Sequence, residues 1–217
     1  MFNLKLVLLK QFTLIGSKHS LNFAVTRKQN RSFYVTLAIQ NKNMKKILVF
    51  GGSNSKNSIN KKLAIYASKQ VNDVKTTIVD LNDYPLPMYG IDLENESGIP
   101  ENVVKFYALI EAADGIVVSL AEHNGSYTAV FKNLLDWLSR HEAKSFGEIP
   151  MLLLSTSPGG RAGIGVMEAA LSRFPRQGAN VVGNYSLPSF HDNFKDGILL
   201  NEAPEFKSAI ESFQNAL

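Results

Sequence analysis

From Met44 onward, short hydrophobic runs alternate with segments whose hydrophobic residues recur at helical spacing. Runs that are apolar at nearly every position predict strands buried on both faces of a parallel sheet, because neither face then needs polar residues. Five strands are predicted, at Ile47–Phe50, Thr76–Leu81, Gly115–Leu120, Met151–Leu154 and Val181–Leu187, the second of them from its β-branched residues.

Five helices are predicted between and after these strands, because hydrophobic residues there recur every three or four positions. These positions fall within residues 63–71, 103–110, 130–138, 164–174 and 206–217. The segment Asp83–Pro100 holds three prolines and two glycines. Because Pro and Gly interrupt regular structure, we expect most of this segment to be loop.

Strands that alternate with helices predict an α/β fold, a three-layer sandwich around a five-stranded parallel sheet. Right-handed crossovers leave few topologies, and five strands of this length favour the flavodoxin-like order 2-1-3-4-5. In that order a ligand binds outside the carboxyl ends of the first and third strands, where the strand order reverses.

Composition and motifs exclude several kinds of site. The chain has no cysteine, which rules out disulfides, thiol nucleophiles, Cys-ligated zinc and iron–sulfur clusters. The four histidines do not form an HExxH motif, and no G-x-S-x-G nucleophile elbow occurs. We therefore assign no metal ligand and no catalytic residue.

The net charge of +4 comes entirely from residues 1–43, which hold seven Lys or Arg and no Asp or Glu. Residues 44–217 keep 16 of the 23 basic residues against all 19 acidic ones, a formal charge of −3. A mildly acidic body gives little support to a nucleic-acid surface. The aliphatic run Leu6–Leu9 is too short to span a membrane. We expect neither nucleic acid nor a membrane as a partner.

Residues 1–43 allow two interpretations. The segment is either an over-extended start, with Met44 as the true initiator, or a targeting peptide with the basic, acid-free composition of a mitochondrial presequence. We expect residues 44–217 to form the functional domain. The expected location is cytoplasmic, or mitochondrial if residues 1–43 are a real presequence.

Three loops that follow predicted strands hold the candidate chemistry. The first, Gly51–Asn60, offers hydroxyl, amide and backbone N–H groups at a helix start, which can hold a phosphate dianion. It is neither a Walker loop nor a GxGxxG turn. The alternative is a polar turn in which Ser58 only caps the helix. Ala121–Tyr127 and Ser155–Gly163 are glycine-containing turns that allow close approach to a flat ligand, or that serve tight packing alone.

These loops resemble the NAD(P)H-dependent FMN reductase family. Gly52–Asn60 is similar to its G-S-x-R-x-x-S-x-N pattern, Glu122–Trp137 to its P-E-Y-N-G-S-x-x-x-x-L-K-N-x-x-D-W segment, and Ser157–Gly163 to its S-P-G-x-x-x-G turn. The resemblance implies non-covalently bound FMN, with its phosphate in the first loop and its isoalloxazine ring against the other two. The cofactor-binding residues it implies are Ser53, Ser55, Ser58, Asn60, Glu122, His123, Asn124, Gly125, Ser157, Pro158, Gly159 and Gly160.

The chain departs from the family pattern at three positions. Ser55 replaces the usual Arg, Ala121 replaces Pro, and His123 replaces Tyr. Losing the Arg removes a cation near the phosphate or the incoming nicotinamide nucleotide, for which Lys56 is a partial substitute. The ring contacts expected of the second loop are largely backbone, so the other two changes affect them less.

The resemblance implies an oxidoreductase that moves hydride from NADPH or NADH to FMN and then to a quinone, a flavin or another small oxidised acceptor. Two alternatives remain open, a non-enzymatic electron carrier of the same fold and a flavin-free interaction protein. The family also implies a homodimer or homotetramer, with Lys132–Arg140 as a candidate contact surface.

Overall fold

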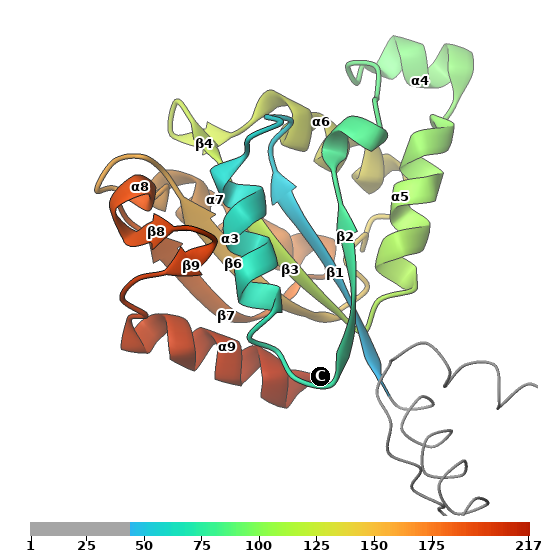
Figure 1. Ribbon diagram of the computed structural model, residues 1–217. Coiled ribbons are helices and arrows are strands. Elements are labelled where there is room, and N and C mark those ends of the chain that lie inside the picture. Colours follow the sequence, from blue (N-terminus) through green and yellow to red (C-terminus); the bar gives the residue numbers. More distant parts are fainter. Residues whose placement is uncertain (1–43) are drawn as a thin grey trace, which may run out of the picture. The chain divides into compact units, whose positions relative to one another are not determined.

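The computed structural model describes residues 44–217, so both interpretations of residues 1–43 lie outside the described residues. Its main sheet has five parallel strands in the order β2-β1-β3-β6-β7. This confirms the predicted order 2-1-3-4-5 (Figure 1). The strands are β1 Lys45–Gly52, β2 Val74–Val79, β3 Gly115–Leu120, β6 Pro150–Thr156 and β7 Asn180–Leu187.

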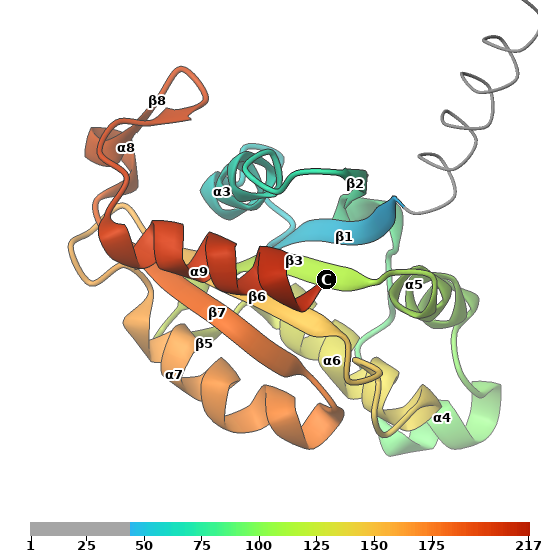
Figure 2. The ribbon, with the colours of Figure 1, turned by 90° about the horizontal axis from the view of Figure 1, so that it is seen from below.

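Helices cover both faces of this sheet (Figure 2). Neighbouring residues of a strand point to opposite faces, so Ile47 and Val49 of β1 belong to one core while Leu48 and Phe50 belong to the other. The first core is closed by α3 Ile59–Ser68 and α9 Pro204–Ala216. The second is closed by α5 Glu101–Glu111, α6 Ala129–His141 and α7 Ile164–Arg173.

The connection over residues 83–100 contains more helix than its prolines suggest. A 3-10 turn spans Leu81–Asp83, and the two-turn helix α4 spans Ile91–Ser97. Helix α4 occupies the stretch between two helix-breaking glycines. Gly90 is its N-cap residue and Gly98, whose φ is +71°, is its C-cap residue. Ten of the eighteen residues from Asp83 to Pro100 lie outside these helical turns, so the segment is mostly loop as expected, but helix α4 was not predicted.

Smaller elements follow the carboxyl ends of the strands. The second loop folds into a hairpin of β4 Glu122–His123 and β5 Ser126–Tyr127. After β7 come the single-turn α8 Phe190–Asn193 and a second hairpin. That hairpin consists of β8 Phe194–Lys195 and β9 Ile198–Leu199. Elsewhere, a 3-10 turn at Phe174–Gln177 directly follows α7. Among residues 44–217, no helix has the length and apolar character needed to cross a membrane.

Candidate functional site

The three predicted loops meet in one cleft at the carboxyl end of the sheet. The cleft measures about 220 Å³ and is lined by residues of the segments that follow β1, β3 and β6. Figure 1 shows where these strands end. Carboxyl ends of parallel strands meet at one edge of a sheet, which is why loops far apart in sequence converge there. Eight residues expected at the site line it: Ser53, Ser55, Ser58, Asn60, Glu122, His123, Ser157 and Pro158.

Four residues expected at the site do not line the cleft. Asn124 and Gly125 form the turn of the β4–β5 hairpin, where both adopt positive φ values of 51° and 76°. Gly159 and Gly160 lie in the third loop, and a Cβ atom on either of them would meet no atom within 4 Å. These glycines therefore border open space and are not required for packing inside the protein.

Four further residues line the cleft that were not among the expected cofactor-binding residues. Asn57 and Ile59 belong to the first loop and the first turn of α3, Ala121 to the second loop, and Thr156 to the end of β6. All four lie inside the segments already identified from sequence. The loop patterns do not show which residues of these segments face the cleft.

Helix α3 begins at the cleft. Its first residue, Ile59, lines the cleft, and the Ser58 side chain accepts a hydrogen bond from the Lys61 backbone N–H at 3.1 Å. The first N–H groups of any helix have no intrahelical partner and carry partial positive charge, so they attract anions. Ser58 caps the helix with its oxygen and keeps its hydroxyl hydrogen free to donate. The cap and a phosphate ligand are therefore compatible roles.

The Asn60 side chain ties the first loop to two strands. It is 1% exposed, and its amide nitrogen donates to the Thr156 carbonyl at 3.0 Å. Its amide oxygen accepts from the Thr156 backbone N–H at 3.0 Å and from the Ser119 hydroxyl at 2.7 Å. Asn60 lines the cleft, but its amide is already engaged by the protein. Its main contribution is to hold the start of α3 against the ends of β3 and β6.

Two glycines allow the first loop to approach its neighbours closely. A Cβ on Gly51 would stand 2.7 Å from the Lys61 backbone nitrogen, and one on Gly52 would stand 2.9 Å from a Leu120 methyl carbon. Real Cβ atoms do not come this close, so larger residues would push β1 away from α3 and β3. The Thr128 hydroxyl adds a hydrogen bond of 2.8 Å to the Gly52 carbonyl.

Glu122 connects the second loop to α7. Its carboxylate accepts a hydrogen bond of 2.9 Å from the Val166 backbone N–H, in the first turn of that helix. The N-cap residue of α7 is Gly163, which has no side chain to cap the helix, so Glu122 supplies the missing acceptor from 44 residues away. Gly165 permits this contact, because a Cβ there would lie 2.9 Å from the carboxylate.

The third loop is held by hydrogen bonds to the segment that follows β7. The backbone N–H of Phe190 donates to the Ser157 carbonyl and that of Ser189 to the Gly159 carbonyl, both at 3.0 Å. Buried Ser155 donates to the Ala162 carbonyl at 2.8 Å. The backbone of this loop is thus fixed from both sides, which suits a rigid wall for a flat ligand.

The hydrogen-bond donors that the cleft offers to an anion are uncharged. None of its lining residues in the described part of the chain is Lys or Arg, and all three departures from the family pattern, Ser55, Ala121 and His123, line it. The ammonium group of Lys61, in the first turn of α3, already forms an ion pair with Asp80 at 2.6 Å. This hydrogen bond from Lys61 lowers the pKa of the Asp80 carboxyl. Binding of an anion in the cleft therefore depends on hydroxyls, backbone N–H groups and the helix start.

Comparison with known proteins identifies relatives of this chain. The model of the NADPH-dependent FMN reductase family matches residues 45–192. An uncharacterized protein of Mycoplasma pneumoniae is 29% identical over 147 residues, which cover 65% of this chain and 86% of that protein. A 2-hydroxy-1,4-benzoquinone reductase of a Burkholderia species is 37% identical over 116 residues, 52% of this chain and 61% of that reductase.

Solved structures support the same fold. FerB, a flavoenzyme NAD(P)H:(acceptor) oxidoreductase from Paracoccus denitrificans, superposes with a TM-score of 0.63 at 24% identity, covering 80% of this chain and 97% of FerB. The family match includes all three loops of the cleft. It confirms the predicted family, FMN as cofactor with NAD(P)H as reductant, and a flavin-dependent reductase as the class of enzyme. This chain therefore belongs to the NADPH-dependent FMN reductase family.

Proposed function

We propose that the cleft holds FMN, with its phosphate at the start of α3 and its ring against the second and third loops. The observation that carries this proposal is the convergence of Ser53, Ser55 and Ser58 with the first turn of α3 in one cleft. Hydroxyl and backbone N–H donors at a helix start suit a phosphate dianion without a metal ion. Among the described residues, no group of three or more His, Asp or Glu side chains is arranged to hold a metal.

The size of the cleft fits one end of the cofactor. Pockets that enclose a whole drug-sized ligand usually measure about 300–1,000 Å³, and this cleft measures about 220 Å³. It therefore suits the phosphate and its chain, while the flat ring lies at the open mouth beside His123 and Pro158. Gly159 and Gly160, which border open space, leave that mouth uncrowded.

The protein contributes binding and orientation, because FMN itself supplies the hydride-accepting chemistry. Ser58 and the first turn of α3 anchor the phosphate end. The loop containing Pro158, braced by Phe190 and Ser189, supports the ring. An open mouth lets NAD(P)H and then an oxidised acceptor reach the same face in turn. A quinone is the proposed acceptor, supported by the likeness to the benzoquinone reductase.

We also propose a homodimer or homotetramer, which the exposed apolar residues Met88 and Ile91 support. Their relative exposures are 72% and 52%. Both lie near α6: Arg140 of that helix pairs with Glu94 of α4 at 2.9 Å, and Trp137 of α6 donates to the carbonyl of Pro87, the residue before Met88, at 2.9 Å. The polar positions of α6 from Lys132 to Arg140 would then form the rim of the contact. Sedimentation velocity of the full chain tests this proposal, and a monomer at micromolar concentration would refute it.

An anaerobic absorbance experiment tests the reductase proposal. Purified protein loaded with FMN should bleach rapidly on addition of NADPH or NADH, and a quinone should then restore the oxidised spectrum. Steady-state kinetics should be ping-pong, because one open face serves donor and acceptor successively. Flavin that stays oxidised for minutes under excess of both nucleotides would favour the electron-carrier alternative. Protein that binds no added FMN would favour the flavin-free alternative.

A further inference from the structure

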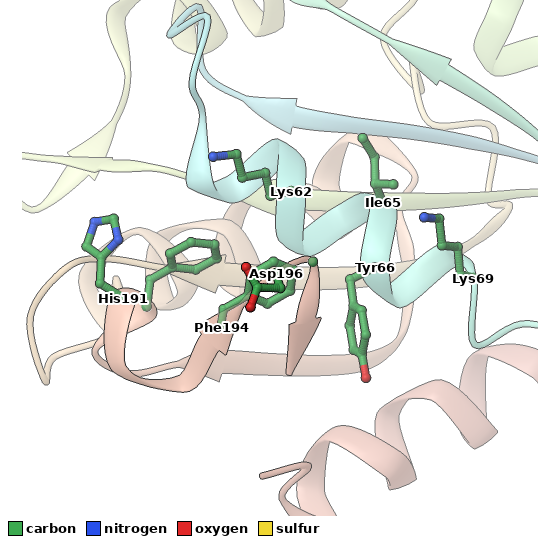
Figure 3. A pocket seen from close by; sticks show the side chains of 9 residues that line it. Lys62, Ile65, Tyr66, Lys69, His191, Phe194 and Asp196 are labelled. Carbon is green, nitrogen blue, oxygen red and sulfur yellow. The ribbon is translucent and has the colours of Figure 1, made fainter. Parts of the chain in front are cut away.

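A second and larger pocket lies on the α3 side of the sheet (Figure 3). It measures about 470 Å³ and shares no lining residue with the cleft. Figure 3 shows its two walls, one formed by α3 with Lys62, Ile65, Tyr66 and Lys69, the other by the segment of α8 and β8. Its volume is within the range of about 300–1,000 Å³ that is usual for small-molecule sites.

Aromatic rings form the floor of this pocket. Phe190 and Phe194 stack with ring centroids 4.8 Å apart, and the Tyr66 ring meets Phe194 edge to face at 5.5 Å. The hydroxyl of Tyr66 is fixed by its hydrogen bond to Glu202. These contacts make a rigid apolar surface, and the exposed ring of His191 stands at its edge, 5.5 Å from Phe190.

Positive charge prevails at the rim. Lys62 and Lys69 are exposed, and neither belongs to any ion pair within residues 44–217. Asp196 is the one acidic residue among the lining residues of this pocket. A ligand that combines an aromatic or heterocyclic ring with more than one negative charge matches this arrangement. A neutral or cationic ligand would leave both lysines without a partner.

The pocket is structurally connected to the cleft in two ways. Helix α3 starts in the cleft at Ile59 and supplies the pocket wall from Lys62 to Lys69. The ten residues of α3, Ile59–Ser68, extend about 15 Å at 1.5 Å per residue. In addition, the Phe190 N–H on the pocket side donates to the Ser157 carbonyl on the cleft side. A ligand extended along α3 can therefore reach both sites.

We propose that this pocket binds the adenosine-phosphate half of NADPH while the nicotinamide half lies at the mouth of the cleft. The inference rests on the proposed function, which requires a nicotinamide dinucleotide at that mouth. The adenine ring would lie against the aromatic floor beside His191, and Lys62 and Lys69 would contact the phosphates. Two cations favour the dinucleotide with the additional 2′-phosphate, so the pocket selects NADPH over NADH.

Binding of adenosine 2′,5′-bisphosphate to the full chain tests the pocket directly, without any turnover. Titration calorimetry should show weaker binding to the double variant Lys62→Ala/Lys69→Ala. The expected loss is roughly 2- to 30-fold, from about 0.2–1 kcal/mol for each of two exposed ion pairs. Lys75→Ala is the matched control, because Lys75 is an exposed lysine on β2 that does not line the pocket. Equal binding to wild type and double variant would overturn the proposal.

A second measurement compares NADPH with reduced nicotinamide mononucleotide, which lacks the adenylate half. The double variant should need a higher NADPH concentration for half-maximal bleaching of FMN, with an unchanged response to the mononucleotide. Asp196→Asn should shift NADPH in the opposite direction, because it removes a negative charge near the phosphates. Equal shifts for both nucleotides would contradict the pocket assignment. If no nucleotide bleaches the wild-type flavin, the proposed function fails, and the calorimetry still decides whether the pocket binds the bisphosphate.

Discussion

Replacing Asn60 with Ala tests whether this residue is a structural tie or a direct ligand of FMN. The change removes three hydrogen bonds, of 3.0, 3.0 and 2.7 Å, from a side chain that is 1% exposed. It leaves the buried Thr156 backbone and the Ser119 hydroxyl without these partners. At about 0.5–1.5 kcal/mol net for each bond, the expected loss is about 2–4 kcal/mol of unfolding free energy.

Thermal unfolding of the flavin-free protein, followed by circular dichroism, measures this loss. A domain of this size shifts its Tm by about 2–4 °C for each kcal/mol, so a loss of about 2–4 kcal/mol should make Asn60→Ala melt about 4–16 °C below wild type. Asn57→Ala is the matched control, because Asn57 lines the same cleft from the same loop but is exposed. Its Tm should change by no more than about 2 °C, the usual effect of an exposed substitution.

The result that would refute this reasoning is an Asn60→Ala protein with wild-type Tm. If such a protein also bound FMN poorly, Asn60 would be a direct ligand and its hydrogen bonds to Thr156 would contribute little. If the Tm falls as expected, weaker FMN binding follows indirectly. The first and third loops would then have lost the side chain that holds them together across the cleft.

Four further outcomes are expected. Ser58→Ala should weaken FMN binding about 10- to 100-fold, since a hydrogen bond to a charged group is worth about 1.5–3 kcal/mol. Riboflavin, which lacks the phosphate, should bind wild type and variant equally in fluorescence titrations. If the variant lost the same affinity for FMN and for riboflavin, Ser58 would act only as a helix cap. Glu122→Ala should cost about 0.5–2 kcal/mol of unfolding free energy through its lost helix cap, and Glu122→Gln, which keeps an acceptor, should cost less in urea melts. Burial, and then the hydrogen bond to Glu202, raises the pKa of Tyr66 to about 12. The stability that goes with a raised pKa is fully present below the unfolded pKa of about 10 and is lost as the pH rises through the folded pKa. Wild type should therefore lose stability relative to Tyr66→Phe between about pH 10 and 12, and parallel alkaline unfolding curves for the two proteins would contradict this. The chain shortened to residues 44–217 should melt and bind FMN like the full chain, and a large fall in Tm would show that residues 1–43 contribute to the fold.

Much of the architecture follows from the sequence because the signals are local. Apolar runs, and β-branched residues in the case of β2, identified the five strands, and β-α alternation with right-handed crossovers predicted their order as observed. Helix α4 was missed because the prolines and glycines near it dominated the pattern, although residues 91–97 contain neither. The convergence of the loops was also predictable, since parallel strands present their carboxyl ends at one edge.

The direction of each side chain in the cleft was decided by tertiary contacts. Asn60 has the residue type of a phosphate ligand, yet its partners Thr156 and Ser119 lie 96 and 59 residues away. Glu122 has the family pattern of a cofactor residue, yet its carboxylate caps a helix 44 residues further on. A local sequence pattern cannot predict such pairs, because a hydrogen bond between residues far apart in sequence depends on the positions of both segments in the folded chain.

The sequence by itself determined the element types, the sheet order and the segments that build the cleft, because hydrophobic periodicity and strand-end loops are properties of short stretches. Tertiary structure alone decided which loop residues face the cleft and which, like Gly159 and Gly160, border open space. It also created the second pocket, by bringing α3 against α8 and β8 from the far end of the chain. Burial and hydrogen bonding depend on such packing, and packing is a property of the whole folded chain.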